Sequence, residues 1–166
     1  AVNLSAVQFR RGNLLLSVTQ ALADSGLEPS RLELELTESL LLDDAEQVLE
    51  TVRRFKALGV CLSIDDFGTG YSSLAYLKRF AVDKLKIDQS FVRDIVSDPD
   101  DAAIVRAIIS MARSLKLKVI AEGVETAELA SFLNLYHCHE AQGYHYARPM
   151  PADELAAWLL QYQARG

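Results

Sequence analysis

The sequence has little cysteine, no long apolar run and no secretion signal. Its two cysteines, Cys61 and Cys138, lie far apart, which favours reduced thiols over a disulfide framework. No apolar run reaches the roughly 18 residues that are needed to span a bilayer. The first residues lack the basic and apolar regions of a signal peptide. We therefore expect a cytoplasmic domain, on its own or as part of a membrane-attached protein.

Positive charge is also scarce. The 166 residues carry 17 Lys and Arg against 23 Asp and Glu, a net charge of −6, and no Lys/Arg run exceeds two residues. A surface that binds a nucleic acid polymer usually shows a basic patch, so such a partner is not expected. A small anionic ligand held through a metal ion remains compatible with this charge. The length is enough for one domain with a real core.

Strand-like and helix-like segments alternate along the chain. Residues 32–38 and 82–88 alternate apolar and polar side chains with period two, which predicts strands, and apolar residues recur at helical spacing over 14–22 and 48–58. We predict six strands, over residues 2–5, 32–38, 60–64, 82–88, 118–123 and 140–144. Strands that alternate with helices indicate a parallel sheet covered by helices, and thus an α/β fold in a single domain over residues 1–166.

Capping residues predict where several helices begin and end. Gly26 lies where a C-terminal cap glycine belongs, and Thr126 is placed to cap a helix that runs to Leu135. Asp43 or Asp44 is the expected cap of the helix before residue 58, and Asp100 or Asp101 that of a long helix after Pro99. Short helices are expected over residues 71–77 and 91–96.

Nearly every predicted strand carries a polar residue at or near its C-terminal end. These residues are Asn3, Glu35, Asp65 with Asp66, Lys86, Glu122 and Gln142. One such residue is most often a cap or a loop residue, and Asp65 to Gly70 alone could be a surface turn. Six strands that share the feature favour a common site, because the C-terminal ends of parallel strands lie on one edge.

The residue types at this edge point to a hard cation. Asn3, Glu35, Asp65 and Asp66 are oxygen donors of the kind that Mg²⁺ and Mn²⁺ prefer. Adjacent aspartates suit two ions that share a bridging carboxylate, an arrangement used in phosphoryl transfer. Lys86 could supply a positive charge at the place where a negatively charged phosphate group would lie. Glu122 could accept a proton from water or complete the metal shell.

Several motifs together resemble the bacterial EAL domain, and the resemblance covers essentially the whole chain in order. They are Val2-Asn3-Leu4-Ser5, Glu35-Leu36-Thr37-Glu38, Ile64-Asp65-Asp66-Phe67-Gly68-Thr69-Gly70-Tyr71-Ser72-Ser73-Leu74, Leu85-Lys86-Ile87-Asp88, Ile120-Ala121-Glu122-Gly123-Val124-Glu125-Thr126, and Ala141-Gln142-Gly143-Tyr144 with Arg148-Pro149.

The resemblance implies a TIM-like barrel and an activity. The family hydrolyses cyclic di-GMP to linear pGpG with Mg²⁺ or Mn²⁺, and the positions imply a role for each matching residue. Metal ligands are Asn3, Glu35 and Asp65 for one ion, and Asp65 and Asp66 for a second. Lys86 contacts the attacking water, and Glu122 is the general base or a ligand of the second ion. Glu38 anchors the glycine loop after Asp66, while Glu125 and Gln142 are supporting polar groups. No substrate-binding residue is assigned.

One departure from the family concerns the start of the chain. No Glu-Ala-Leu tripeptide lies upstream of Asn3, and six strands are predicted where a complete barrel has eight. We therefore expect the later six strand-helix units of the barrel, with weak or no activity in this piece alone. A homodimer through the loop-bearing face, and sensory or GGDEF-type domains in a longer chain, are the expected partners. A non-catalytic cyclic di-GMP receptor or interaction module is the second hypothesis, and a barrel enzyme with another substrate the third.

Overall fold

A computed structural model describes residues 1–10, 12–42, 45–70 and 74–163 of the protein. Its centre is a six-stranded parallel sheet whose strands follow one another in chain order. The strands are β1 (Val2–Leu4), β2 (Glu33–Thr37), β3 (Cys61–Phe67), β4 (Lys84–Ile87), β5 (Lys118–Ala121) and β6 (Glu140–Ala141). Six predicted strands are thus confirmed, and consecutive parallel neighbours are what a barrel wall requires.

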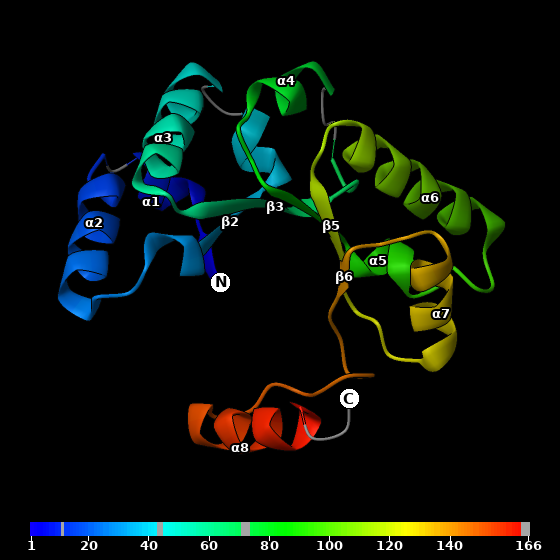
Figure 1. The fold of residues 1–166 in the computed structure, drawn as a ribbon. Helices are drawn as coiled ribbons and strands as arrows, with labels where there is room; N and C mark the ends of the chain where they lie inside the picture. Colours follow the sequence, from blue (N-terminus) through cyan, green and yellow to red (C-terminus); the bar gives the residue numbers. More distant parts are fainter. Residues whose placement is uncertain (11, 43–44, 71–73, 164–166) are drawn as a thin grey trace.

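Helices cover the outer side of the curved sheet, whereas α8 lies across its open side (Figure 1). The helices are α1 (Ala6–Arg10), α2 (Leu14–Ser25), α3 (Ala45–Leu58), α4 (Leu74–Arg79), α5 (Gln89–Val92), α6 (Pro99–Ser114), α7 (Ala127–Leu135) and α8 (Ala152–Gln163), with 3-10 turns at η1 (Pro29–Arg31) and η2 (Glu38–Leu42). In the described part of the chain, no helix combines the length and apolar character that crossing a membrane requires.

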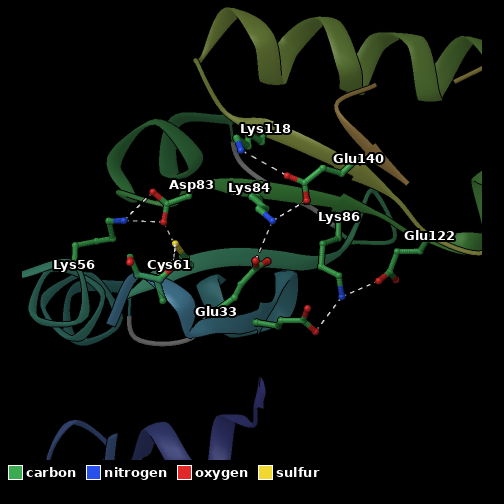
Figure 2. Close-up of polar contacts among 12 residues, drawn as sticks. Glu33, Lys56, Cys61, Asp83, Lys84, Lys86, Lys118, Glu122 and Glu140 are labelled. Atoms are coloured by element: carbon green, nitrogen blue, oxygen red, sulfur yellow. Dashed lines mark hydrogen bonds and ion pairs between the residues drawn. The ribbon is translucent and has the colours of Figure 1, made fainter. Parts of the chain in front are cut away.

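The two faces of the sheet differ in chemistry. Apolar strand residues such as Leu36, Ile64 and Ile87 are fully buried in the core beneath the helices. Many of the residues that alternate with them are charged, and Figure 2 shows the lysines of β4 among acids from other parts of the sheet. This alternation follows from the two-residue period of a strand. It places the polar side chains on the inner face.

Some helix boundaries agree with the sequence and others do not. Gly26 adopts the left-handed conformation (φ 64°) after α2, and the Thr126 hydroxyl accepts a hydrogen bond from the Leu129 amide, as predicted. The predicted cap of α6, Asp100 or Asp101, is wrong. The Asp98 side chain caps this helix by accepting a hydrogen bond from the Asp100 amide (2.8 Å). Pro99 occupies the first turn, where its missing N–H costs nothing, and so shifts the cap to the residue before it.

The two predicted short helices are both present, but one of them starts earlier than expected. The expected helix over 91–96 is α5, at residues 89–92, because the Asp88 side chain caps the Ser90 amide and starts it earlier. The helix expected over 71–77 corresponds to α4, whose described residues are Leu74–Arg79. Residues 71–73 lie outside the described residues, as do the predicted caps Asp43 and Asp44. A short helix, α1, occupies residues 6–10, for which no helix was predicted.

Asp83 ties three elements together ahead of β4. Its carboxylate accepts hydrogen bonds from Lys56 Nζ on α3 (2.7 Å) and from the Leu62 amide of β3 (2.8 Å), as Figure 2 shows for Lys56. We expect Asp83→Ala to lower the free energy of unfolding by about 1.5–3 kcal/mol, because a half-buried amide and ammonium lose a charged acceptor.

Urea denaturation would measure this change. The matched control is Glu50→Ala, which removes the exposed pair with Arg54 on α3 (3.0 Å) and should cost no more than about 0.5 kcal/mol. Equal losses in the two variants would contradict a special role for Asp83.

Candidate functional site

The predicted strand-end residues converge because the strands are parallel and in register. Asn3 pairs with Glu35 across β1 and β2, and Thr37 pairs with Asp65 across β2 and β3. Strand β4 then brings Lys86 beside this group, and β5 ends immediately before Glu122. The side chains therefore meet at one edge of the sheet, as the C-terminal ends of parallel strands should.

A local irregularity in β3 lets two successive aspartates serve the same site. The pairing register with β4 shifts between Ile64 and Phe67, and Asp66 has a positive φ of 54°. A regular strand would send Asp65 and Asp66 to opposite faces, whereas a bulge re-aims one of them. Carboxylate oxygens of Asp65, Asp66 and Glu122 all lie within 4.8 Å of one another. Such a group of oxygens can hold a metal ion.

Lys86 lies at the centre of the acidic residues. Its Nζ atom forms ion pairs with Glu35 (3.0 Å), Asp65 (2.9 Å) and Glu122 (2.7 Å), and its side chain is only 5% exposed. Burial alone would lower the pKa of Lys86, but hydrogen bonds to Glu122, Asp65 and Glu35 outweigh it and raise the pKa above its ordinary value. These contacts favour the protonated form of Lys86.

Glu122 combines partial burial with two donors. Burial raises its pKa above the ordinary value, against the opposing effect of Lys86. Its Oε1 atom accepts from Gln142 Nε2 (2.9 Å) and from Lys86 Nζ (2.7 Å). The hydrogen bond from Gln142 therefore orients the Glu122 carboxylate. It also places Gln142, which was predicted as a supporting polar group, beside the site.

Asn3 lies against two of the acids. Its amide suits its surroundings when the nitrogen donates to Asp65 Oδ2 (3.2 Å) and Glu35 Oε2 (3.1 Å). A metal ion would instead take the amide oxygen, since the nitrogen has no free lone pair to offer. The position of Asn3 fits a ligand of the same ion as Glu35 and Asp65, with the amide turned over.

Asp88 is a site residue that sequence reasoning missed. Burial raises the pKa of Asp66, and the nearby carboxylates of Asp65 and Asp88 raise it further. Asp88 follows Lys86 by two residues, so the period of the strand could have placed both on the inner face. The acidic group thus extends from β3 to the start of α5.

Glu38 contacts the glycine loop after Asp66, where the family resemblance placed it. Its buried carboxylate accepts hydrogen bonds from the amides of Gly68 (2.9 Å) and Gly70 (3.3 Å) through Oε2. A Cβ atom on Gly70 would come within 2.9 Å of Glu38 Oε1, so a side chain there would push the carboxylate away. The glycine allows the loop to approach this closely.

We expect Glu38→Gln to loosen this loop and to cost about 1–3 kcal/mol of stability, because a charged acceptor shared by two amides is lost. Hydrogen exchange of the Gly68 and Gly70 amides should become faster. Glu46→Gln is the control, since its pair with Arg79 (2.7 Å) is exposed and should matter little. Unchanged exchange at both glycines would contradict the anchoring role.

A cavity of about 620 Å³ opens beside Glu122. Gln89 from α5, Gln142 and the segment after β6 line it, and the Arg148 guanidinium lies 4.4 Å from the centre of the Tyr144 ring. Glu125 is exposed and lines the same cavity. The cavity joins the acidic group to a planar aromatic and cationic surface, which suits a phosphorylated aromatic ligand.

Comparisons with known proteins identify the family. The family described as "EAL domain" matches residues 1–149. The chain is 52% identical over 157 residues to the bifunctional diguanylate cyclase/cyclic di-GMP phosphodiesterase MucR of Pseudomonas aeruginosa, covering 95% of this chain and 23% of that protein. It is 48% identical over 163 residues to the cyclic di-GMP phosphodiesterase NbdA of the same organism, covering 98% and 21%.

Solved structures show the same likeness. The MucR phosphodiesterase in complex with cyclic di-GMP matches with a TM-score of 0.89 and 51% identity, over 92% of this chain and 62% of that one. Klebsiella pneumoniae BlrP1, in a complex with manganese and cyclic di-GMP, matches with a TM-score of 0.82 and 33% identity, over 89% and 38%. The chain spans less than a quarter of the length of either curated relative.

Proposed function

Because the chain belongs to the EAL domain family, we propose that it forms the catalytic core of a metal-dependent phosphodiesterase that hydrolyses cyclic di-GMP to linear pGpG. The observation that carries the proposal is the convergence of Asp65, Asp66 and Glu122 within 4.8 Å beside Lys86. Two relatives, 52% and 48% identical to this chain, are named as cyclic di-GMP phosphodiesterases.

The acidic group fits divalent metal ions. Five oxygen-bearing side chains lie on or beside the cluster, and all are hard donors. We infer two ions, Mg²⁺ or Mn²⁺, with Asn3, Glu35 and Asp65 holding one, and Asp65, Asp66 and Glu122 the other. When bound, such ions neutralise phosphate charge and make water more acidic.

The remaining groups support proton transfer and orientation. Glu122, with its raised pKa and its contact to Gln142, is placed to accept a proton from water. Lys86 is protonated and can donate a hydrogen bond toward the phosphate or the attacking water. Arg148 and Tyr144 in the adjoining cavity offer a charged and an aromatic surface to a guanine nucleotide.

The glycine loop is a candidate for contact with a second copy of the chain. It is held by Glu38 on one side, and Gly68 packs against Phe91 and Ile108 on the other. We propose a homodimer through this face, which would connect subunit contacts to Asp66. Sensory or GGDEF-type domains in a longer chain are further proposed partners, supported by the bifunctional diguanylate cyclase/phosphodiesterase name of MucR.

Product analysis tests the proposed activity. A folded protein that contains this chain in its complete domain, incubated with cyclic di-GMP and Mg²⁺ or Mn²⁺, should release pGpG, and a chelator should stop the reaction. Tight binding of cyclic di-GMP without product would overturn catalysis and favour a receptor.

A further inference from the structure

The ammonium group of Lys86 has three acidic partners that saturate it. A lysine ammonium carries three N–H donors, and here Glu35, Asp65 and Glu122 lie at 2.7–3.0 Å from Nζ. The partner side chains are 10–16% exposed, so water contributes little to their solvation. Without this cation, three partly buried carboxylates would face one another with only the neutral donors Asn3 and Gln142 beside them and no counter-ion, which is costly.

The same three carboxylates are ligands in the proposed metal site. We propose that Lys86 is an internal counter-ion that holds this cluster together when metal is absent and sets its affinity for divalent cations; the proposal rests on the proposed metal site. A bound ion and the ammonium attract the same carboxylate charge and repel each other, an effect that remains strong at the effective dielectric constant of a protein.

When a metal ion competes with the ammonium for the carboxylates, only the side chain of Lys86 has to move. The flanking residues Leu85 and Ile87 are fully buried in the core, so the backbone of β4 is held in place. The lysine stem is flexible and its ammonium is a compact charge, so Nζ can shift while the strand stays still. Metal binding therefore needs only the ammonium to give up some of its carboxylate contacts.

Lys84 provides a matched comparison within the same strand. It lies two residues earlier on the same face and forms similar ion pairs, with Glu33 (3.0 Å) and Glu140 (2.7 Å), as Figure 2 shows. Neither of these acids is a proposed ligand. Removal of the Lys84 charge thus reproduces the loss of a half-buried lysine without touching the cluster.

Mn²⁺ titration of the intact protein that contains this chain, with free Mn²⁺ followed by electron paramagnetic resonance, tests the inference. Lys86→Met should bind Mn²⁺ at least tenfold more tightly than the unaltered protein, whereas Lys84→Met should stay within about twofold. In chelator, Lys86→Met should also lose more thermal stability than it does with Mn²⁺ present. Lys86→Gln, which keeps hydrogen-bond donors but no charge, should show the same gain if the methionine variant fails to fold.

The possible failures are distinct. Unchanged or weaker Mn²⁺ binding by a folded Lys86→Gln or Lys86→Met protein would overturn the counter-ion role while leaving the metal site standing. Absence of Mn²⁺ binding in the unaltered protein would overturn the metal site, and with it the inference. An equal gain in Lys84→Met would show a general charge effect and would also overturn it.

Discussion

Replacement of Glu122 by glutamine is expected to slow cyclic di-GMP hydrolysis by about two to four orders of magnitude, the usual contribution of a general base. Glutamine keeps the shape of the side chain but cannot accept the proton. The Glu122 carboxylate accepts a hydrogen bond from Gln142 Nε2 (2.9 Å), which holds it in position to take up a proton during the reaction. Initial rates of pGpG formation at saturating substrate would measure the loss.

Glu140→Gln is the matched control for this prediction. Glu140 approaches Lys84 at 2.7 Å, the distance at which Glu122 approaches Lys86, but it lies away from the proposed ligands. Turnover by this variant should stay within a few-fold of the unaltered enzyme. A Glu122→Gln enzyme that binds cyclic di-GMP and turns it over at the normal rate would show that another group accepts the proton.

A second large effect is expected at Gly143, because its backbone packs directly on that of Val124. A Cβ atom on Gly143 would overlap the Val124 nitrogen and oxygen. The Val124 amide donates a hydrogen bond to the Gln142 carbonyl, and the Val124 carbonyl accepts one from the His145 amide, both at 3.0 Å. Gly143→Ala should therefore cost about 3 kcal/mol through overpacking and lost hydrogen bonds. It should also lower turnover, because Gln142 is displaced from Glu122.

Gly26→Ala separates this close approach from ordinary glycine effects. Gly26 has a left-handed φ of 64°, and a Cβ atom there would meet nothing within 4 Å. The variant should lose about 1–2 kcal/mol in urea denaturation, the cost of a left-handed alanine, with turnover unchanged. Gly143→Ala with full stability and full turnover would contradict the packing argument.

The sequence predicted the fold and much of the site for a common reason. Alternating residues on β2 and β4, and polar residues at strand ends, are local patterns whose consequences in a parallel sheet are geometric. The structure brings Glu35, Asp65, Lys86 and Glu122 into contact, as that geometry requires. Their catalytic roles stay predictions.

Other features depended on interactions that local patterns do not encode. The bulge that turns Asp66 toward Glu122 arises from pairing between β3 and β4, which no residue spacing reveals. The capping role of Asp98 depended on Pro99, whose preference for the first turn outweighed the two later aspartates. The spacing of Asp88 two residues after Lys86 could have placed it near Asp66, but within the motif Leu85-Lys86-Ile87-Asp88 only Lys86 received a predicted role.

Hydrolysis of cyclic di-GMP in ¹⁸O-labelled water tests the central claim most directly. The complete domain with Mn²⁺ should yield pGpG whose terminal phosphate carries one ¹⁸O atom, as detected by mass spectrometry, and none should form in chelator. Recovery of unchanged cyclic di-GMP from folded protein that binds both Mn²⁺ and the nucleotide would contradict the account.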